Sequence, residues 1–264
     1  MKKIALTSLL AVMAVSGADA AAKNVLDGNP LYMPQKHHFV SETSLESHTQ
    51  GTRDVTLGER FGVGFTDSFM LAVETSMSEN NTFSSVSWND VEVDATYRLI
   101  GSGSWKMDLG AGYGMGPMRA YGYKFLDKDL TTYAARIGVR GGYVHKDWTL
   151  AGHFNLIYAN SEMFNWADDK DMWQNHIMNL GFTGFWQMSD YWSWVVSADY
   201  FKILDRYGDP EAAGYWDVTA GLNLNIDTTK YIGLYITKEI DHTGKGQWED
   251  LDGFGFGAKF GVDF

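Results

Sequence analysis

The sequence predicts an all-β protein: a closed, antiparallel transmembrane β-barrel of about 12 strands in meander order. Three observations predict it. The chain opens with a segment that has the form of an export signal, its body consists of segments in which apolar and polar residues alternate, and short and long connections follow one another in turn. The 264-residue chain has no cysteine and no linker-like change of composition, so we expect one domain without disulfides.

The first 20 residues have the pattern of a secretory signal peptide. Lys2 and Lys3 provide a positive start, residues 4–15 are almost all apolar, and Ala18-Asp19-Ala20 has the form of a cleavage site. The apolar run is too short for a transmembrane helix, which needs roughly 20 residues. We therefore predict a signal peptide and Sec-directed export.

Each predicted strand has one apolar face and one polar face. In VEVDATYRLI (91–100) the apolar residues alternate with acidic, hydroxyl and basic ones, and WKMDLGAGYGM (105–115) and WDVTAGLNLNI (216–226) follow the same rule. Successive strand residues point to opposite sides, so this is the period of a strand. Twelve such segments begin near His38, Asp54, Phe69, Ser87, Trp105, Thr131, Trp148, Met172, Tyr191, Tyr215, Tyr231 and Gly253.

The connections alternate in length. Five are short: TDS (66–68), GSGS (101–104), HKD (145–147), MSD (188–190) and DTTK (227–230). Most of the others are long: SENNTFSSV (78–86), GPMRAYGYKFLDKDL (116–130), NSEMFNWADDKD (160–171), LDRYGDPEAAG (204–214) and HTGKGQWEDLD (242–252). Because the short turns follow the even-numbered strands, we expect both chain ends on the short-turn side of the barrel.

Two architectures share this period. A soluble sandwich or lipocalin-like barrel would bury the apolar faces inside, whereas a membrane barrel turns them toward lipid and keeps the polar faces in the lumen. Three features favour the membrane barrel. The polar faces are rich in glycine and not in Lys and Glu, the strands are long, and Trp and Tyr recur at both strand ends, where a bilayer barrel needs amphipathic rings.

The chain ends in GFGFGAKFGVDF, an alternation that closes on Phe264. Together with the signal peptide, the strand pattern and the unequal connections, this ending resembles the bacterial outer-membrane β-barrel proteins. The resemblance covers the whole mature chain and does not select a subfamily. It implies that the last strand pairs with the first, that the barrel-assembly machinery reads Phe264 as an assembly signal, and that the short turns face the periplasm.

The same resemblance implies a place in the bacterial outer membrane, among its lipid and lipopolysaccharide. We divide the chain into the signal peptide (1–20), a periplasmic N-terminal lead (21–37) and the barrel (38–264). The lead has two possible courses, hanging in the periplasm or entering the lumen, and it lacks the period of a helical plug. The oligomeric state is left open.

The polar faces supply the candidate functional residues. Charged groups of both signs are predicted to line the pore, and opposite charges lie on neighbouring strands, as with Arg98 and Asp108 or Glu239 and Lys259. They either fill the lumen by mutual pairing or form a constriction that orients a small polar solute. The predicted pore-lining residues are Arg60, Glu74, Glu92, Asp94, Arg98, Lys106, Asp108, Arg136, Arg140, His153, Asp199, Asp217, Glu239 and Lys259.

Other chemistry is not indicated. The acidic chain, with a net charge of −12, has no basic footprint for nucleic acid, and GAGYGMG (110–116) lies within one strand, not in a phosphate loop. We predict no catalytic residues, since Asp241 and His242 point to opposite faces, and neither a metal site nor a cofactor, since no ligand spacing fits.

The function predicted from these features is a narrow passive channel for small polar solutes. Two alternatives stay open: a closed structural or surface-interaction barrel that acts through its outer loops, and an outer-membrane barrel hydrolase.

Overall fold

The computed structural model describes residues 29–48, 55–79, 86–117, 131–164, 170–206, 214–241 and 253–264. The predicted signal peptide, His242, most of GPMRAYGYKFLDKDL and most of the acidic loop residues lie outside the described residues. The side chain of Glu239 also lies outside them, although its backbone belongs to a strand.

Twelve strands make up the described fold, and their starts agree with the predicted ones to within two residues. They are β1 (Phe39–His48), β2 (Val55–Thr66), β3 (Phe69–Glu79), β4 (Val86–Ile100), β5 (Trp105–Pro117), β6 (Thr131–Val144), β7 (Trp148–Phe164), β8 (Lys170–Gln187), β9 (Trp192–Arg206), β10 (Gly214–Asn225), β11 (Lys230–Asp241) and β12 (Phe254–Asp263).

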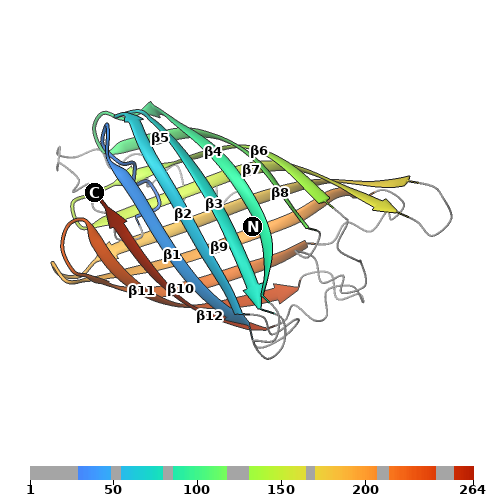
Figure 1. The fold of residues 1–264 in the computed structure, drawn as a ribbon. Coiled ribbons are helices and arrows are strands. Elements are labelled where there is room, and N and C mark those ends of the chain that lie inside the picture. Colours follow the sequence, from blue (N-terminus) through green and yellow to red (C-terminus); the bar gives the residue numbers. More distant parts are fainter. Residues whose placement is uncertain are drawn as a thin grey trace, which may run out of the picture.

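The strands close into one barrel in which every strand pairs with its sequence neighbours and β1 pairs with β12 (Figure 1). All pairings are antiparallel, so the predicted all-β meander barrel is confirmed. One boundary was wrong. β7 runs to Phe164 and β8 starts at Lys170, so most of the predicted loop 160–171 is strand. Within the described residues, no helix has the length and apolar character to cross a membrane.

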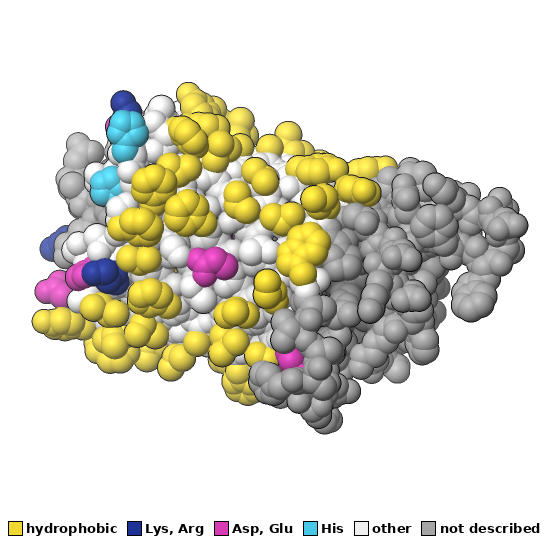
Figure 2. Space-filling view, in the orientation of Figure 1, with side chains coloured by type: hydrophobic (Ala, Val, Ile, Leu, Met, Phe, Trp, Pro, Cys, Tyr) yellow, Lys and Arg dark blue, Asp and Glu magenta, His cyan; other side chains and the backbone are white. Residues whose placement is uncertain are grey.

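The outer surface of the barrel carries the apolar faces of the strands. Figure 2 shows hydrophobic side chains spread over the viewed side, with most of the charged groups toward one end and an acidic side chain in the middle of the surface. Tyr113, Ile137 and Leu234 are 56%, 65% and 63% exposed, although each lies within a paired strand. A water-soluble barrel would bury such residues, whereas a bilayer covers them, so the inverted arrangement predicted for a membrane barrel is present.

Closure of the barrel depends on the two terminal strands. Phe39 and Phe264 exchange both backbone hydrogen bonds, at 2.8 and 2.9 Å, and their rings stack at 5.9 Å between centroids. Phe39 also stacks on Phe61 of β2 at 5.7 Å. The last residue of the chain therefore covers the seam on the outer surface, where an aromatic side chain would contact lipid.

One acidic residue breaks the outer apolar face. Glu59 alternates outward between Leu57 and Phe61, and both of its carboxylate oxygens accept hydrogen bonds of 2.6 Å, one from the Ser41 hydroxyl and one from the Thr43 hydroxyl. These bonds join β1 to β2 across the outer surface. They satisfy part of the hydrogen-bonding capacity of a carboxylate that faces lipid.

We predict that Glu59→Leu leaves the barrel folded and raises its free energy of unfolding by about 1 kcal/mol, because an acidic group on a lipid-facing position costs stability. Denaturant unfolding in lipid vesicles measures the change. Val63→Leu, an apolar exchange at another outward position of β2, is the control and should have little effect. A loss of stability in Glu59→Leu would show that the two hydroxyl bonds outweigh the cost of the carboxylate.

Candidate pore and its lining

The lumen of the barrel holds a buried ion-pair network around Asp108 on β5. The Asp108 side chain is 0% exposed and accepts from two arginines: Arg98 Nε lies 2.8 Å from Oδ1, and Arg140 Nε lies 2.8 Å from Oδ2. Register places Asp108 directly between these residues on β4 and β6. The expected pairing of Arg98 with Asp108 is therefore present, and Arg140 joins it.

A second network lies farther from the short turns on the same strands. Arg136 of β6 donates to Glu92 at 3.0 Å and also to Asp94, both on β4. Gly112 of β5 lies between the partners, and a Cβ added there would collide with Asp94 and Glu92 and lie 3.4 Å from Arg136 Nη2. The glycine therefore lets β4 and β6 side chains meet across β5.

On the next strands the lumen wall changes from arginine to histidine and amides. His153 Nε2 lies 2.8 Å from the Asn179 side-chain oxygen and 3.1 Å from Asp199 Oδ1. Asn155 donates to the same Asn179 oxygen at 2.9 Å. Asp217 pairs with Asp199 in the β9–β10 register and with Glu239 in the β10–β11 register, so acidic positions continue around this side of the barrel.

The wall formed by β1, β11 and β12 is lined by tyrosines and glutamates. The Tyr231 hydroxyl donates to Glu42 at 2.6 Å, and the Tyr235 hydroxyl donates to Glu46 at 2.8 Å. Lys259 lies 3.4 Å from Glu42 and over the Tyr235 ring. Added Cβ atoms at Gly257 and Gly261 of β12 would collide with the Tyr235 and Tyr231 rings. The tyrosine rings therefore lie flat on the neighbouring strand because β12 has glycine there.

The remaining predicted pore residues occupy other positions. Arg60 and Glu74 face each other in the β2–β3 register at 3.9 Å, a loose ion pair. Lys106 donates to the carbonyl oxygen of Gly101, near the β4–β5 turn, so its charge lies at the short-turn end. Sequence reasoning missed Glu42, Glu46 and the inward direction of Tyr231. Tyr231 lies at a strand end, where tyrosines were expected to face the bilayer, yet it is 2% exposed.

Residues 29–36, which precede β1, fold into the short-turn mouth of the barrel, and we call them the lumen segment. Leu31 is 3% exposed and packs against Val144 and Ala151 on β6 and β7. Arg98 donates to the Leu31 carbonyl oxygen at 2.6 Å, and Arg140 lies 3.3 Å from that of Tyr32. Of the two courses left open for the N-terminal lead, its described part takes the one into the lumen.

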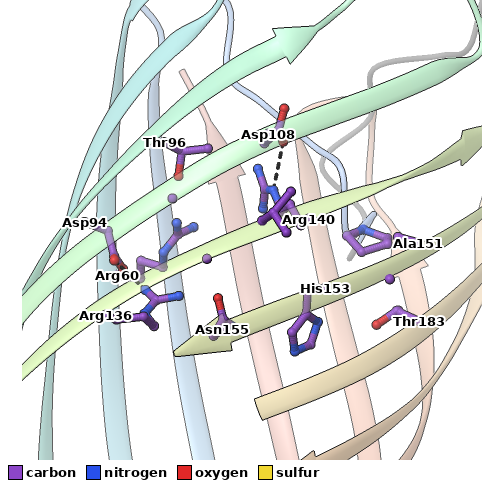
Figure 3. Close-up of a pocket in the computed structure, with 15 residues that line it drawn as sticks. Arg60, Asp94, Thr96, Asp108, Arg136, Arg140, Ala151, His153, Asn155 and Thr183 are labelled. Carbon is purple, nitrogen blue, oxygen red and sulfur yellow. Dashed lines mark hydrogen bonds and ion pairs between the residues drawn. The ribbon is translucent and has the colours of Figure 1, made fainter. Parts of the chain in front are cut away.

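Two cavities occupy the lumen beside this segment. One, of about 320 Å³, is bounded by β4 to β7 and includes Asp94, Asp108, Arg136 and His153 on its wall (Figure 3). The other, of about 410 Å³, is bounded by β1 and β9 to β12 and includes Glu42, Glu46, Tyr231, Tyr235 and Lys259. Both cavities touch Pro30 of the lumen segment and also Arg60, Arg140 and Thr183.

The described lumen offers polar groups for binding, not a metal centre. In the described ranges, no group of three or more His, Asp or Glu side chains is placed to hold a metal ion. The imidazole of His153 contacts an amide and a carboxylate, with no described serine hydroxyl bonded to it. The arrangement can form hydrogen bonds to a small polar solute and orient it. The arginine side offers donors, and the glutamate side offers acceptors.

Comparison with known proteins finds no family model and no curated protein that matches this chain. Solved structures do match in fold. The COG4313 outer membrane channel from Pseudomonas putida F1 aligns with a TM-score of 0.61 at 10% identity, over 90% of this chain and 98% of that one. The NanC porin aligns with a TM-score of 0.59 at 11% identity, over 85% and 98%. The chain has the fold of outer-membrane β-barrel porins.

This porin-like barrel also resembles a transport domain of another kind. The translocator domain of the autotransporter NalP from Neisseria meningitidis aligns with a TM-score of 0.55 at 12% identity, over 100% of this chain and 95% of that one. At such low identities the likeness concerns fold alone. The choice of function therefore depends on the lumen of this barrel.

Proposed function

We propose that this protein is a narrow passive channel for small polar solutes in a bacterial outer membrane, reached by export through the signal peptide, and that it is not an enzyme. The observation that carries the proposal is the pair of polar-lined cavities in the lumen, of about 320 and 410 Å³. Side chains fill the interior of a barrel of about eight strands, whereas about sixteen strands leave an aqueous channel, so twelve strands give room for a narrow open passage. The similar solved structures include the NanC and KdgM porins and the COG4313 channel, which agrees with the proposal.

The charges of the lumen favour cations. Acidic groups outnumber basic ones among the inward side chains on the described strands, and an excess of one sign selects the opposite ion. The acidic set is Glu42, Glu46, Glu74, Asp90, Glu92, Asp94, Asp108, Asp199, Asp217 and Asp263, against Arg60, Arg98, Lys106, Arg136, Arg140 and Lys259.

One observation favours the second candidate, a closed structural or surface-interaction barrel acting through its outer loops. The lumen segment lies in the short-turn mouth and narrows it. A barrel that conducts no ions in any state, while remaining folded, would support this candidate over the channel.

The channel proposal predicts that Arg136→Ala combined with Arg140→Ala increases the preference for cations. The change removes two positive charges from one cavity wall and leaves Glu92 and Asp94 without their arginine. The potassium-to-chloride permeability ratio in a planar bilayer should rise several-fold. Lys146→Ala, in the exposed β6–β7 turn, is the control and should leave the ratio near wild type. An unchanged ratio in the double variant would count against these residues as the pore lining.

A further inference from the structure

The lumen segment crosses the barrel from one wall to the opposite one. It leads into β1, yet Leu31 packs against β6 and β7. In the closed strand order, five strands separate β1 from β7 in either direction, so these strands face each other across the lumen. The segment therefore spans the short-turn mouth. The two cavities lie beside it, one bounded by β4 to β7 and the other by β1 and β9 to β12.

The segment is docked by side-chain contacts. Leu31 is buried against the β6–β7 wall, the arginines bound to Asp108 reach two of its carbonyl oxygens, and the Tyr32 hydroxyl donates to Asp263. Inside the segment, Tyr32 N donates to the Asn29 carbonyl, and at its end Lys36 N donates to the Asp67 carboxylate in the β2–β3 turn at 3.1 Å. Pairing with β2 begins only at His37, whose N–H donates to Gly64 at 2.6 Å. The segment can leave the lumen without breaking any strand pairing.

The junction with β1 has the form of a hinge. His37 has φ of +67°, in the left-handed region that is strained for a residue with a Cβ. Beside it, the segment passes directly over Gly64 of β2. A Cβ at Gly64 would collide with the Gln35 carbonyl oxygen and lie 3.0 Å from that of Pro34. This glycine therefore allows the docked position, and the left-handed corner provides a point where the chain can turn out of the mouth.

We propose that residues 29–36 form a displaceable bar that regulates the channel: docked, it restricts passage to the spaces on either side, and undocked, it joins them into one wider pore. The inference rests on the proposed channel function. The docked bar is held by the same two arginines that pair with Asp108, so the occupancy of the mouth is coupled to the ion-pair network of the lumen wall.

Two variants of the full mature chain test the proposal. Gly64→Ala places a Cβ against the docked bar, and Gly184→Ala adds the same methyl group to a glycine of β8 that lines neither cavity and where the nearest contact would be 4.0 Å away. Because undocking adds the space that the bar occupies to that of the two cavities, we expect Gly64→Ala to raise single-channel conductance about two-fold, and Gly184→Ala to leave it unchanged. Heat-modified gel mobility checks that both barrels fold.

A disulfide lock gives the complementary test, because the chain has no cysteine of its own. In the variant Leu31→Cys with Ala151→Cys, oxidation should form a bond between neighbouring residues and fix the bar, and mass spectrometry reports whether it forms. Conductance should be low when oxidised and should rise on reduction.

The outcomes separate the two proposals. Equal conductance in the oxidised and reduced lock, or failure of the pair to oxidise in a folded barrel, would overturn the bar while leaving the channel intact. Absence of conductance in every variant, with correct folding, would overturn the channel itself and the bar with it.

Discussion

Replacement of Asp108 by alanine is expected to lower the free energy of unfolding of the barrel by about 3–5 kcal/mol, the usual cost of breaking a buried ion pair by removing one partner. Asp108 has no solvent exposure and accepts from Arg98 and Arg140 on the two neighbouring strands. Without it, two guanidinium groups face each other in the lumen wall with no carboxylate between them. Urea unfolding in lipid vesicles, followed by the fluorescence of the 10 tryptophans, measures the loss.

Asp227→Ala is the matched control for this change. Asp227 lies in the exposed β10–β11 turn, where hydrogen bonds from Thr229 hold the pKa of its carboxyl below the ordinary value, and its removal should leave the stability near that of the wild-type barrel. A loss below about 1 kcal/mol in Asp108→Ala would mean that water or other groups replace the carboxylate. The ion-pair network around Asp108 would then contribute little to the stability of the barrel.

Deletion of Phe264 is expected to remove most of the folded barrel from the outer membrane of expressing cells. Phe264 closes the seam, through both backbone hydrogen bonds to Phe39 and through ring stacking. The resemblance to outer-membrane barrels further implies that the terminal Phe is read during assembly. The amount of assembled barrel is measured in membrane fractions as the protein that is accessible at the cell surface and whose gel mobility changes on heating.

Refolding into detergent separates the two roles of Phe264. If the residue acts mainly as an assembly signal, the deleted chain should fold in detergent and lose only the stacking energy, about 0.5–1.5 kcal/mol. Val262→Ala shortens another outward residue of β12 but keeps the terminal Phe, and it should assemble at near wild-type amounts. Assembly of the Phe264 deletion at wild-type amounts would contradict the predicted signal.

The twelve strands could be predicted from the sequence. In a membrane barrel, the two-residue period of a strand coincides with an alternation between lipid-facing and lumen-facing residues. β10 and β12 alternate strictly, with apolar residues toward lipid and small or polar residues toward the lumen, and the structure orients them so. β1 follows the rule less well. Its outward face includes the polar residues Ser41 and Thr43, which donate hydrogen bonds to Glu59. Because both faces of β1 carry polar residues, the sequence did not show that Glu42 and Glu46 point inward.

Other features of the lumen depend on contacts between distant segments. The course of residues 29–36 is set by the fit of Leu31 against Val144 and Ala151, residues more than 110 positions away, and no local period encodes it. Tyr231 was expected among the aromatic residues at strand ends, but β11 turns Ile232 and Leu234 outward and therefore Tyr231 inward, against Gly261 and Glu42. This alternation, together with a glycine opposite the ring on the neighbouring strand, is the sequence signal that gives the orientation.

The single-channel conductance of the refolded mature protein in a planar bilayer tests the proposed channel most directly. We expect steady ionic conductance with a preference for cations, because polar cavities run beside the lumen segment and acidic groups outnumber basic ones on the wall. A correctly folded barrel that conducts no ions would contradict it, and would assign the working part of the molecule to the outer loops.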